Sequence, residues 1–321
     1  MNNDQGHSSK DFSLPSLSFS KRRTIRTCTI DRRKHPSHRH SSPSPHKLIP
    51  VSVNSSEAYT KIKYLVPPYM SAKTWAVYNP LNASILFSQG SESRREIASL
   101  TKIMTCYLSI LLSKQFFIDI NKLVTVSSRA SKILGTSADL AAGDCLTIYE
   151  LLHGLMLPSG NDAAYALAEI FGSQFNKEKP VKHFVEQMNK KADELGLKDT
   201  KFRNPHGMSN RPNFSTAKDV CILASHALKD KLFSEIVNRR EFACQLKNSE
   251  QKVLSWKSTN KLLGKGVDGV KTGQTPKAGN CLCARFINSK FPLIITVLAC
   301  KSKNARWVEV PRLADWVYSK S

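Results

Sequence analysis

Apolar positions divide the chain at about residue 60. Before this point Ser, Arg, His and Pro dominate, as in the stretch DRRKHPSHRHSSPSPHK, and the few apolar residues follow no period. A segment with so little to bury cannot offset the entropy cost of folding. We therefore predict a disordered basic tail over residues 1–60 and a folded domain over 61–321, where apolar residues become dense and periodic.

Strand-like patterns lie at both ends of this folded part. Residues 73–90, KTWAVYNPLNASILFSQG, are typical of two short strands joined by an Asn/Pro turn. Near the C-terminal end, alternating or continuous apolar runs predict three more strands, over 267–275, 279–287 and 291–300.

Helical spacing fills the region between them. The predicted helices cover 99–118, 147–157, 161–172, 181–196, 215–228 and, after the last strand, 307–318. We expect Asn161 or Asp162 to be the N-cap of the third helix and Ser215 to be the N-cap of the fifth. Strands at both ends of a helical middle favour one α+β domain with a shared sheet.

The first of these helices is the most apolar. Its uncharged run extends from Ile103 to Ser113, well short of the ~20 residues that a membrane-spanning helix needs. The pattern therefore predicts a buried core helix and no transmembrane segment.

Charge adds a preference for anionic partners. The formal net charge is +23, and basic residues outnumber acidic ones in the tail and in the folded part alike. No helix-turn-helix, zinc or RNA-binding pattern accompanies the charge, so nucleic acid is not an expected partner. The tail is most simply a solvated segment. An organelle transit peptide or a segment that binds nucleic acid or acidic surfaces is also compatible with its composition.

The cysteine pattern and the composition of the tail indicate in which cellular compartment the protein is found. Eight scattered cysteines with no C-x-x-C pair suit a reducing compartment and give no metal site. Cys281 and Cys283 fall in an alternating stretch, which indicates one face of a strand. No apolar run of signal-peptide length occurs in the tail, so we expect a cytoplasmic or organellar protein rather than a secreted one.

Candidate chemistry begins at Ser99 and Lys102, in the stretch REIASLTKIM. Residues three apart share one face of a helix, and Ser99 would lie at the positive end of the helix dipole. Lys102 would be surrounded by apolar residues, and the loss of water lowers the pKa of an amine. A neutral lysine can act as the base for a serine hydroxyl. Alone, the pair is also compatible with an ordinary capping serine.

Two later stretches add polar groups at sharp backbone features. PSGND places Ser159 and Asn161 on a tight turn between two apolar helices, although a helix stop followed by a cap would look the same. GVKTGQT places Lys271 at the end of a strand, and Gly273 would let a ligand backbone approach closely. A strand edge with a solvated lysine is the simpler alternative.

Taken in order, the motifs S-x-x-K, S-x-N and K-T-G match the signature of β-lactamases and penicillin-binding proteins. The stretches IASLTKIMT, LLHGLMLPSGNDAAYALAE, NPHGM, FSTAKDV and GVDGVKTGQTPKAGNCL extend the likeness. From about residue 70 to 320 the chain resembles the D-alanyl-D-alanine carboxypeptidases, serine peptidase family S11. The resemblance implies a β-lactamase-like α+β fold, with an antiparallel sheet flanked by helices and an all-helical subdomain.

The resemblance also implies roles for the catalytic residues. Ser99 would attack the carbonyl between two terminal D-alanines, with Lys102 as its base, and Ser159 would relay a proton to the leaving amine. The acyl-enzyme would be hydrolysed by water without a cofactor, and β-lactams would be covalent inhibitors.

The remaining assignments concern substrate binding. Asn161 would bind the peptide amide, and the backbone N–H groups of Ser99 and Gln274 would form the oxyanion hole. The residues expected at the terminal carboxylate and along the adjoining strand are Lys271, Thr272, Gly273, Thr275 and Arg306.

Three other functions compete with this one. A β-lactamase would need a carboxylate for deacylation, but the chain has no E-x-x-L-N and its turn is S-G-N rather than S-D-N. A hydrolase of the same fold that acts on another amide or ester stays open. So does a non-catalytic protein that retained the fold, although the intact Ser99, Lys102 and Lys271 speak against it.

Overall fold

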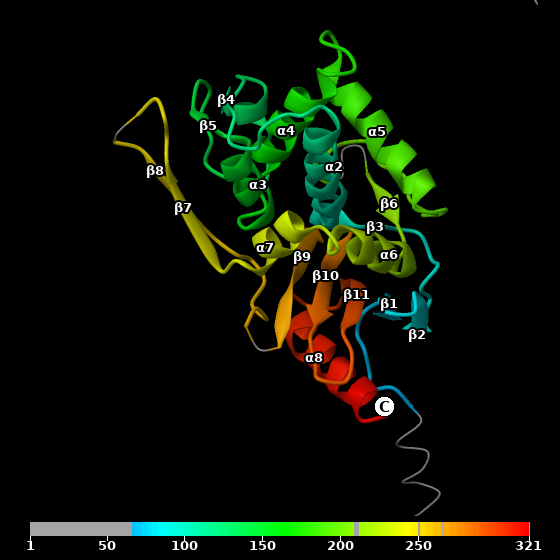
Figure 1. Ribbon diagram of the computed structural model, residues 1–321. Coiled ribbons are helices and arrows are strands. Elements are labelled where there is room, and N and C mark those ends of the chain that lie inside the picture. The colour runs from blue at the N-terminus through cyan, green and yellow to red at the C-terminus, as the bar shows by residue number, and fades with distance from the viewer. Residues whose placement is uncertain (1–65, 209–211, 250, 265, 321) are drawn as a thin grey trace, which may run out of the picture. The chain divides into compact units, whose positions relative to one another are not determined.

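The computed structural model describes residues 66–208, 212–249, 251–264 and 266–320. The predicted disordered tail over 1–60 lies outside the described residues. The five predicted strands are present and form one antiparallel sheet in the order β2–β1–β11–β10–β9 (Figure 1). Its strands are β1 (Thr74–Asn79), β2 (Ser84–Gln89), β9 (Val267–Thr275), β10 (Gly279–Phe286) and β11 (Leu293–Cys300). The shared sheet is thus built from both ends of the folded part.

Alternating side chains give the sheet two apolar faces. On β1, Trp75 and Val77 pack with the side chains of helix α8 (Ala305–Tyr318), whereas Ala76 and Tyr78 join the larger core on the opposite face. Helices α6 (Ala217–Ala227) and α7 (Lys231–Asn238) cover that opposite face. Cys281 and Cys283 both point into the larger core, which confirms the prediction that they share one face of a strand. Helix α7 packs against β9, so this edge strand of the sheet lies beside the helices.

A helical subdomain stands against the same side of the sheet. Its helices are α2 (Thr101–Gln115), α3 (Ile148–Met156), α4 (Asn161–Gly172) and α5 (Pro180–Glu194). Helix α2 contacts all three others as well as α6 and α7 (Figure 1). Most of its side chains are buried. The predicted core helix and all-helical subdomain are therefore present. None of the helices in the described part of the chain is long and apolar enough to cross a membrane.

The start of the core helix differs from the prediction. Ala98 has a left-handed φ of 47°, and a 3₁₀ turn, η1 (Ala98–Leu100), precedes α2. A left-handed residue cannot continue an α-helix, so Ser99 lies in this turn rather than at a helix N-cap. Helix α2 begins two residues later than expected and ends at Gln115.

Two predicted caps are also wrong. Thr216, not Ser215, caps α6 by accepting a hydrogen bond from the Asp219 backbone N–H. Ser215 lies in the short strand β6 (Phe214–Ser215), where its hydroxyl bonds the hydroxyl of Thr200 at 2.7 Å. The N-cap of α4 is Gly160, and no side chain caps that helix.

Several short elements were not predicted. They are the hairpin β7 (Glu241–Gln245) and β8 (Val253–Lys257), the pairs β3 (Arg95–Glu96) with β6 and β4 (Leu123–Thr125) with β5 (Cys145–Thr147), the turn η2 (Ala130–Lys132) and helix α7. The pair β3–β6 matters for the site, because β3 leads directly into the 3₁₀ turn that carries Ser99.

Candidate functional site

Ser99 and Lys102 form the centre of the site. The 3₁₀ turn leaves Ser99 half-buried at the surface of a pocket, and Lys102, in the first turn of α2, is completely buried. Lys102 Nζ lies 3.2 Å from Ser99 Oγ, within hydrogen-bond distance.

The other two partners of Lys102 define what its amine can do. Nζ donates to Asn161 Oδ1 at 2.6 Å and to the His206 carbonyl at 2.8 Å. Both atoms can only accept, so they take two N–H bonds whatever the protonation state. In the neutral amine the lone pair is then left for Ser99, whose hydroxyl can donate. This geometry fits a base that accepts the serine proton.

Burial favours the neutral form of this lysine. Loss of water lowers the pKa of Lys102 well below its ordinary value, and the positive charge of Lys271 lowers it further. The Asp162 carboxylate acts in the opposite direction. The neighbouring His206 is neutral at physiological pH, because burial and, secondly, the proximity of Lys102 lower its pKa to about 3.

The turn before α4 supplies Ser159 and Asn161. Ser159 has a left-handed φ of 71° and is buried, yet its hydroxyl has no hydrogen-bond partner among the described residues. The Thr136 hydroxyl donates to the Ser159 carbonyl at 2.6 Å and fixes this strained residue in place. Ser159 therefore presents an unpaired hydroxyl at the pocket wall.

Strand β9 supplies the opposite wall. Lys271 lies in the middle of β9 and not at its end as the sequence predicted, and it is fully buried. Burial and the nearby Arg306 lower the pKa of Lys271 to about 7. The Thr272 hydroxyl shares a 2.7 Å hydrogen bond with Thr259, a residue to which sequence analysis gave no role.

Gly273 brings β9 against the nucleophile turn. A Cβ at this position would lie 2.9 Å from the Ile97 carbonyl and 3.3 Å from the Leu100 nitrogen. The neighbour that requires glycine here is thus the chain's own backbone beside Ser99.

Arg306 is buried in the first turn of α8, one residue before the predicted start of that helix region. Its Nη1 donates to the carbonyls of Gly273 at 3.0 Å and Cys281 at 2.8 Å, and its guanidinium lies 4.6 Å from the Trp307 ring centre. These bonds hold the cation at the end of the pocket formed by β9.

A pocket of about 620 Å³ joins these elements. The predicted residues that line it are Ser99, Ser159, Asn161, Thr272, Gly273, Gln274, Thr275 and Arg306. Lys102 and Lys271 lie buried behind its wall. None of the described residues that line the pocket is acidic, whereas Lys261, Lys303 and Arg306 all are basic. The arrangement suits an anionic ligand next to a serine nucleophile.

Several residues at the pocket had no predicted role. The NPHGM stretch was noted only as part of the resemblance, yet it supplies the His206 carbonyl and the pocket residues Gly207 and Met208. Its Asn-Pro and His-Gly pairs are turn signals next to a histidine, which could have marked it as a site loop.

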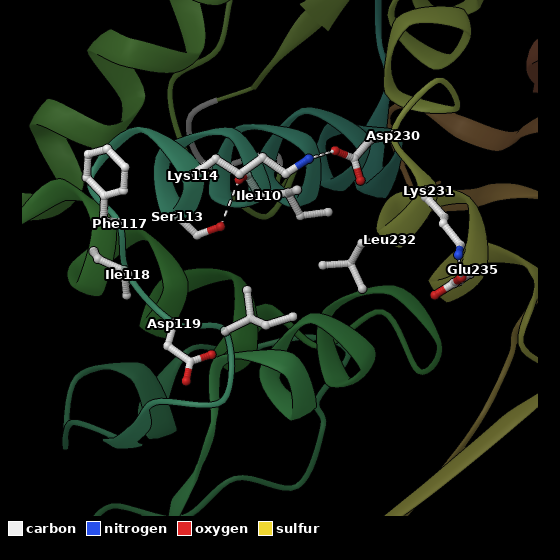
Figure 2. Close-up of a pocket in the computed structure, with 11 residues that line it drawn as sticks. Ile110, Ser113, Lys114, Phe117, Ile118, Asp119, Asp230, Lys231, Leu232 and Glu235 are labelled. Atoms are coloured by element: carbon white, nitrogen blue, oxygen red, sulfur yellow. Dashed lines mark hydrogen bonds and ion pairs between the residues drawn. The ribbon is translucent and has the colours of Figure 1, made fainter.

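A second hollow, of about 790 Å³, lies between the end of α2 and α7 (Figure 2). It offers no comparable chemistry, because the Ser113 hydroxyl bonds the Ile110 carbonyl within the helix. Lys114 is paired with Asp230, and Lys231 lies 3.9 Å from Glu235 (Figure 2). The smaller pocket therefore remains the candidate active site.

Comparison with known proteins agrees with this geometry. Residues 62–302 match the D-alanyl-D-alanine carboxypeptidase family, peptidase family S11. A D-alanyl-D-alanine carboxypeptidase of Streptomyces sp. (strain K15) is 33% identical over 78% of this chain and 89% of its own length. The carboxypeptidase DacF of Bacillus subtilis is also 33% identical, but the match spans 62% of that longer protein.

The fold is also similar to that of a known DD-peptidase. The crystal structure of the Streptomyces K15 DD-transpeptidase superposes with a TM-score of 0.74 at 33% identity, over 79% of this chain and 99% of the other. The family match and the structural likeness confirm the predicted β-lactamase-like α+β fold. The chain belongs to the D-alanyl-D-alanine carboxypeptidase family of serine peptidases.

Proposed function

We propose that this chain is a serine-type carboxypeptidase that hydrolyses the peptide bond between two terminal D-alanines. Its family membership supports the reaction class, and one observation carries the chemistry. Lys102 Nζ is buried between two atoms that can only accept hydrogen bonds, and its third hydrogen-bonding direction points to the Ser99 hydroxyl. A nucleophile and a base are thus already paired in the pocket.

The first half-reaction forms an ester. Ser99 Oγ attacks the carbonyl carbon of the penultimate D-alanine, and its proton passes to Lys102 Nζ. The oxygen of the tetrahedral intermediate is negative, and the backbone N–H groups of Ser99 and Gln274 are the proposed donors to it. The C–N bond then breaks, and Ser159, whose hydroxyl has no other partner among the described residues, gives its proton to the leaving amine. Ser159 takes in return the proton held by Lys102, so the lysine amine is neutral again.

The second half-reaction restores the enzyme. After free D-alanine departs, water attacks the ester carbon and Lys102 accepts its proton. The ester bond breaks, and Lys102 passes this proton to Ser99 Oγ, which restores the serine hydroxyl and the neutral amine. The Asn161 amide is a suitable partner for the substrate backbone, because it lies in the pocket wall and is bonded to Lys102 and to the Leu134 carbonyl.

Selection of a free carboxylate follows from the cations at one end of the pocket. Lys271, Thr272 and Thr275 come from β9, and Arg306 is bonded to the same strand. Guanidinium and ammonium groups recognise a terminal carboxylate and have no such partner in an internal peptide bond. β-Lactams carry both a reactive amide and a carboxylate, so we propose that they acylate Ser99 and block the enzyme.

Release of D-alanine tests the proposal. A peptide that ends in D-Ala-D-Ala should lose one D-alanine per molecule in the presence of the purified protein, and Ser99→Ala should abolish the release. A Ser99→Ala protein with normal turnover, or a wild-type protein that attacks only internal bonds, would contradict the proposal.

A further inference from the structure

Asp162 is a buried carboxylate that the proposed reaction does not use. It is 1% exposed and lies in the first turn of α4, next to Asn161. Its oxygens accept hydrogen bonds from the Ser137 hydroxyl at 2.5 Å, from the backbone nitrogens of Ala138 at 2.9 Å and Leu140 at 3.2 Å, and from the Ala163 nitrogen at 2.8 Å. Most of these donors belong to one segment, residues 134–140, which we call the wall loop.

The wall loop bonds both polar residues of the S-x-N motif. The Leu134 carbonyl accepts from Asn161 Nδ2 at 2.7 Å, and the Thr136 carbonyl accepts from the Asn161 backbone nitrogen at 2.8 Å. The Thr136 hydroxyl donates to the Ser159 carbonyl. A Cβ on Gly135 would lie 2.5 Å from Asn161 Nδ2, so the loop lies directly against the amide.

These contacts decide which way the Asn161 amide faces. Because Nδ2 is committed to the Leu134 carbonyl, Oδ1 must face Lys102 Nζ, from which it accepts at 2.6 Å. If the wall loop moved, the amide could rotate and Lys102 would lose one of the two acceptors that direct its lone pair to Ser99. Ser159 would also lose the bond that fixes its left-handed backbone.

We infer that Asp162 is a positioning residue for acylation: its carboxylate fixes the wall loop, which in turn orients Asn161 toward Lys102 and holds Ser159 at the pocket wall. This inference rests on the proposed serine peptidase function. Asp162 does not touch the reacting atoms, and it acts through the loop.

The test compares Asp162→Asn, Ser137→Ala, the double variant that carries both, and Asp219→Asn by their rates of acylation with a labelled penicillin. Asp162→Asn keeps the shape but places an N–H donor where only acceptors fit. Ser137→Ala removes one donor to the carboxylate and is the milder change. Asp219→Asn is the matched control, since Asp219 is a buried carboxylate in the first turn of α6 that bonds Thr200 and the Asp199 nitrogen and does not line the pocket.

We expect Asp162→Asn to label to completion but at least about tenfold more slowly than the wild type. Misplaced catalytic groups lower the rate of acylation, whereas the fraction of molecules that can be labelled stays the same. Ser137→Ala should slow labelling less, and the double variant should be no slower than Asp162→Asn alone, since both act through one loop. Asp219→Asn should melt at a lower temperature and label at the normal rate.

A second readout separates positioning from simple destabilisation. The titratable groups near Lys102 are Lys271 on β9, Asp162 on α4 and His206, which is neutral at physiological pH. Among the described residues Asp162 is the acidic one of this set, so its loss should lower the pKa of Lys102 and move the acid limb of the acylation rate to lower pH, whereas Ser137→Ala should leave that limb in place.

Wild-type rates in both Asp162→Asn and Ser137→Ala would overturn the inference, as would an equal slowing in Asp219→Asn or a loss of labelled fraction at an unchanged rate. If Asp162→Asn fails to fold, Ser137→Ala decides alone. A wild-type protein that does not label at all would overturn the proposed function instead, so the two failures are distinguishable.

Discussion

At the residue scale, the proposed acylation depends most on Lys102. Its burial, its two carbonyl-type acceptors and its contact with Ser99 all favour an amine that gains a proton during attack. The sequence predicted the pairing and the lowered pKa, because a lysine in an apolar helix has little alternative. It could not predict the His206 carbonyl, which comes from more than a hundred positions later in the chain.

Replacement of Lys102 by Arg separates charge from basicity. Arginine keeps the positive charge and can still donate to both acceptors, but it does not lose its proton. We expect penicillin acylation to fall by about 10²-fold or more, the usual loss when a general base is removed. Stopped-flow or gel-based labelling measures the rate, with Lys114→Arg on the exposed side of the same helix as the control. Near-normal acylation would exclude Lys102 as the base.

The lowered pKa of Lys271 predicts an alkaline limb in the pH profile of kcat/KM. With a pKa of about 7, it is a cation below that pH and loses its charge above it. The substrate carboxylate is proposed to lie beside this cation, which is buried just behind the pocket wall, so kcat/KM for a peptide with a free terminal carboxylate should fall as pH rises through about 7. The methyl ester of the same peptide should lack this alkaline limb. A profile that is flat from pH 6 to pH 9, or the same for both substrates, would contradict the role.

Arg306 has a structural role and a proposed role in carboxylate binding, and kinetics with two substrates can separate them. It bonds the carbonyls of Gly273 and Cys281, and it lies at the end of the pocket where the carboxylate is proposed to bind. Arg306→Ala should lower kcat/KM for the free acid by roughly 10- to 100-fold, the value of a charge-assisted hydrogen bond. The methyl ester should lose less.

Arg312→Ala, on the same helix and outside the pocket lining, should change neither substrate. An equal loss on acid and ester would mean that Arg306 only supports the strand.

At the element scale, the site depends on how three backbone segments meet. The 3₁₀ turn at Ser99, strand β9 and the NPHGM loop approach so closely that glycine is required at two contacts, Gly273 and Gly207. Gly207 has a φ of 93°, and a Cβ there would lie 2.0 Å from the Ala98 carbonyl oxygen. The loop and the nucleophile turn thus hold each other in place.

Gly207→Ala should therefore damage activity more than stability. The clash and the strained φ should cost about 1–3 kcal/mol of unfolding free energy, and the shifted His206 carbonyl should slow acylation by about 10²-fold. Gly196→Ala is the control, because its φ is 70° but no atom lies within 4 Å of the added Cβ. Equal acylation rates in the two variants would contradict this account.

Elements with a long, regular apolar period were predictable and short ones were not. All five sheet strands, the helices from α2 to α6 and helix α8 were expected, since each carries apolar residues that pack into or against a core. Helix α7 has only 8 residues, Lys231–Asn238, about two turns, which is too short to show a helical period in sequence. The 3₁₀ turn could not be predicted either, because the left-handed Ala98 is imposed by the packing of β9 and Gly207 around it.

At the scale of the whole molecule, the fold explains how motifs far apart in sequence meet. The sheet joins β1 to β11, α2 passes through the helical subdomain, and β9 lines the pocket between them. The order of the S-x-x-K, S-x-N and K-T-G motifs carried the family resemblance, and the resemblance implied that these motifs, each on a different element, form one site. The domain boundary near residue 60 and the compartment stay predictions.

Charge at this scale agrees with the proposed substrate. The pocket has basic residues in its lining and no acidic ones among those described, in a chain of net charge +23. Such a field attracts anionic peptides and falls with added salt. The proposed function requires above all that one serine of this chain, Ser99, is the nucleophile.

The most direct test maps the covalent adduct of a penicillin by mass spectrometry. The account predicts a mass increase of one penicillin per molecule, located on the peptide that contains Ser99, and no adduct in Ser99→Ala. An adduct on another residue, or a Ser99→Ala protein that still labels, would contradict it.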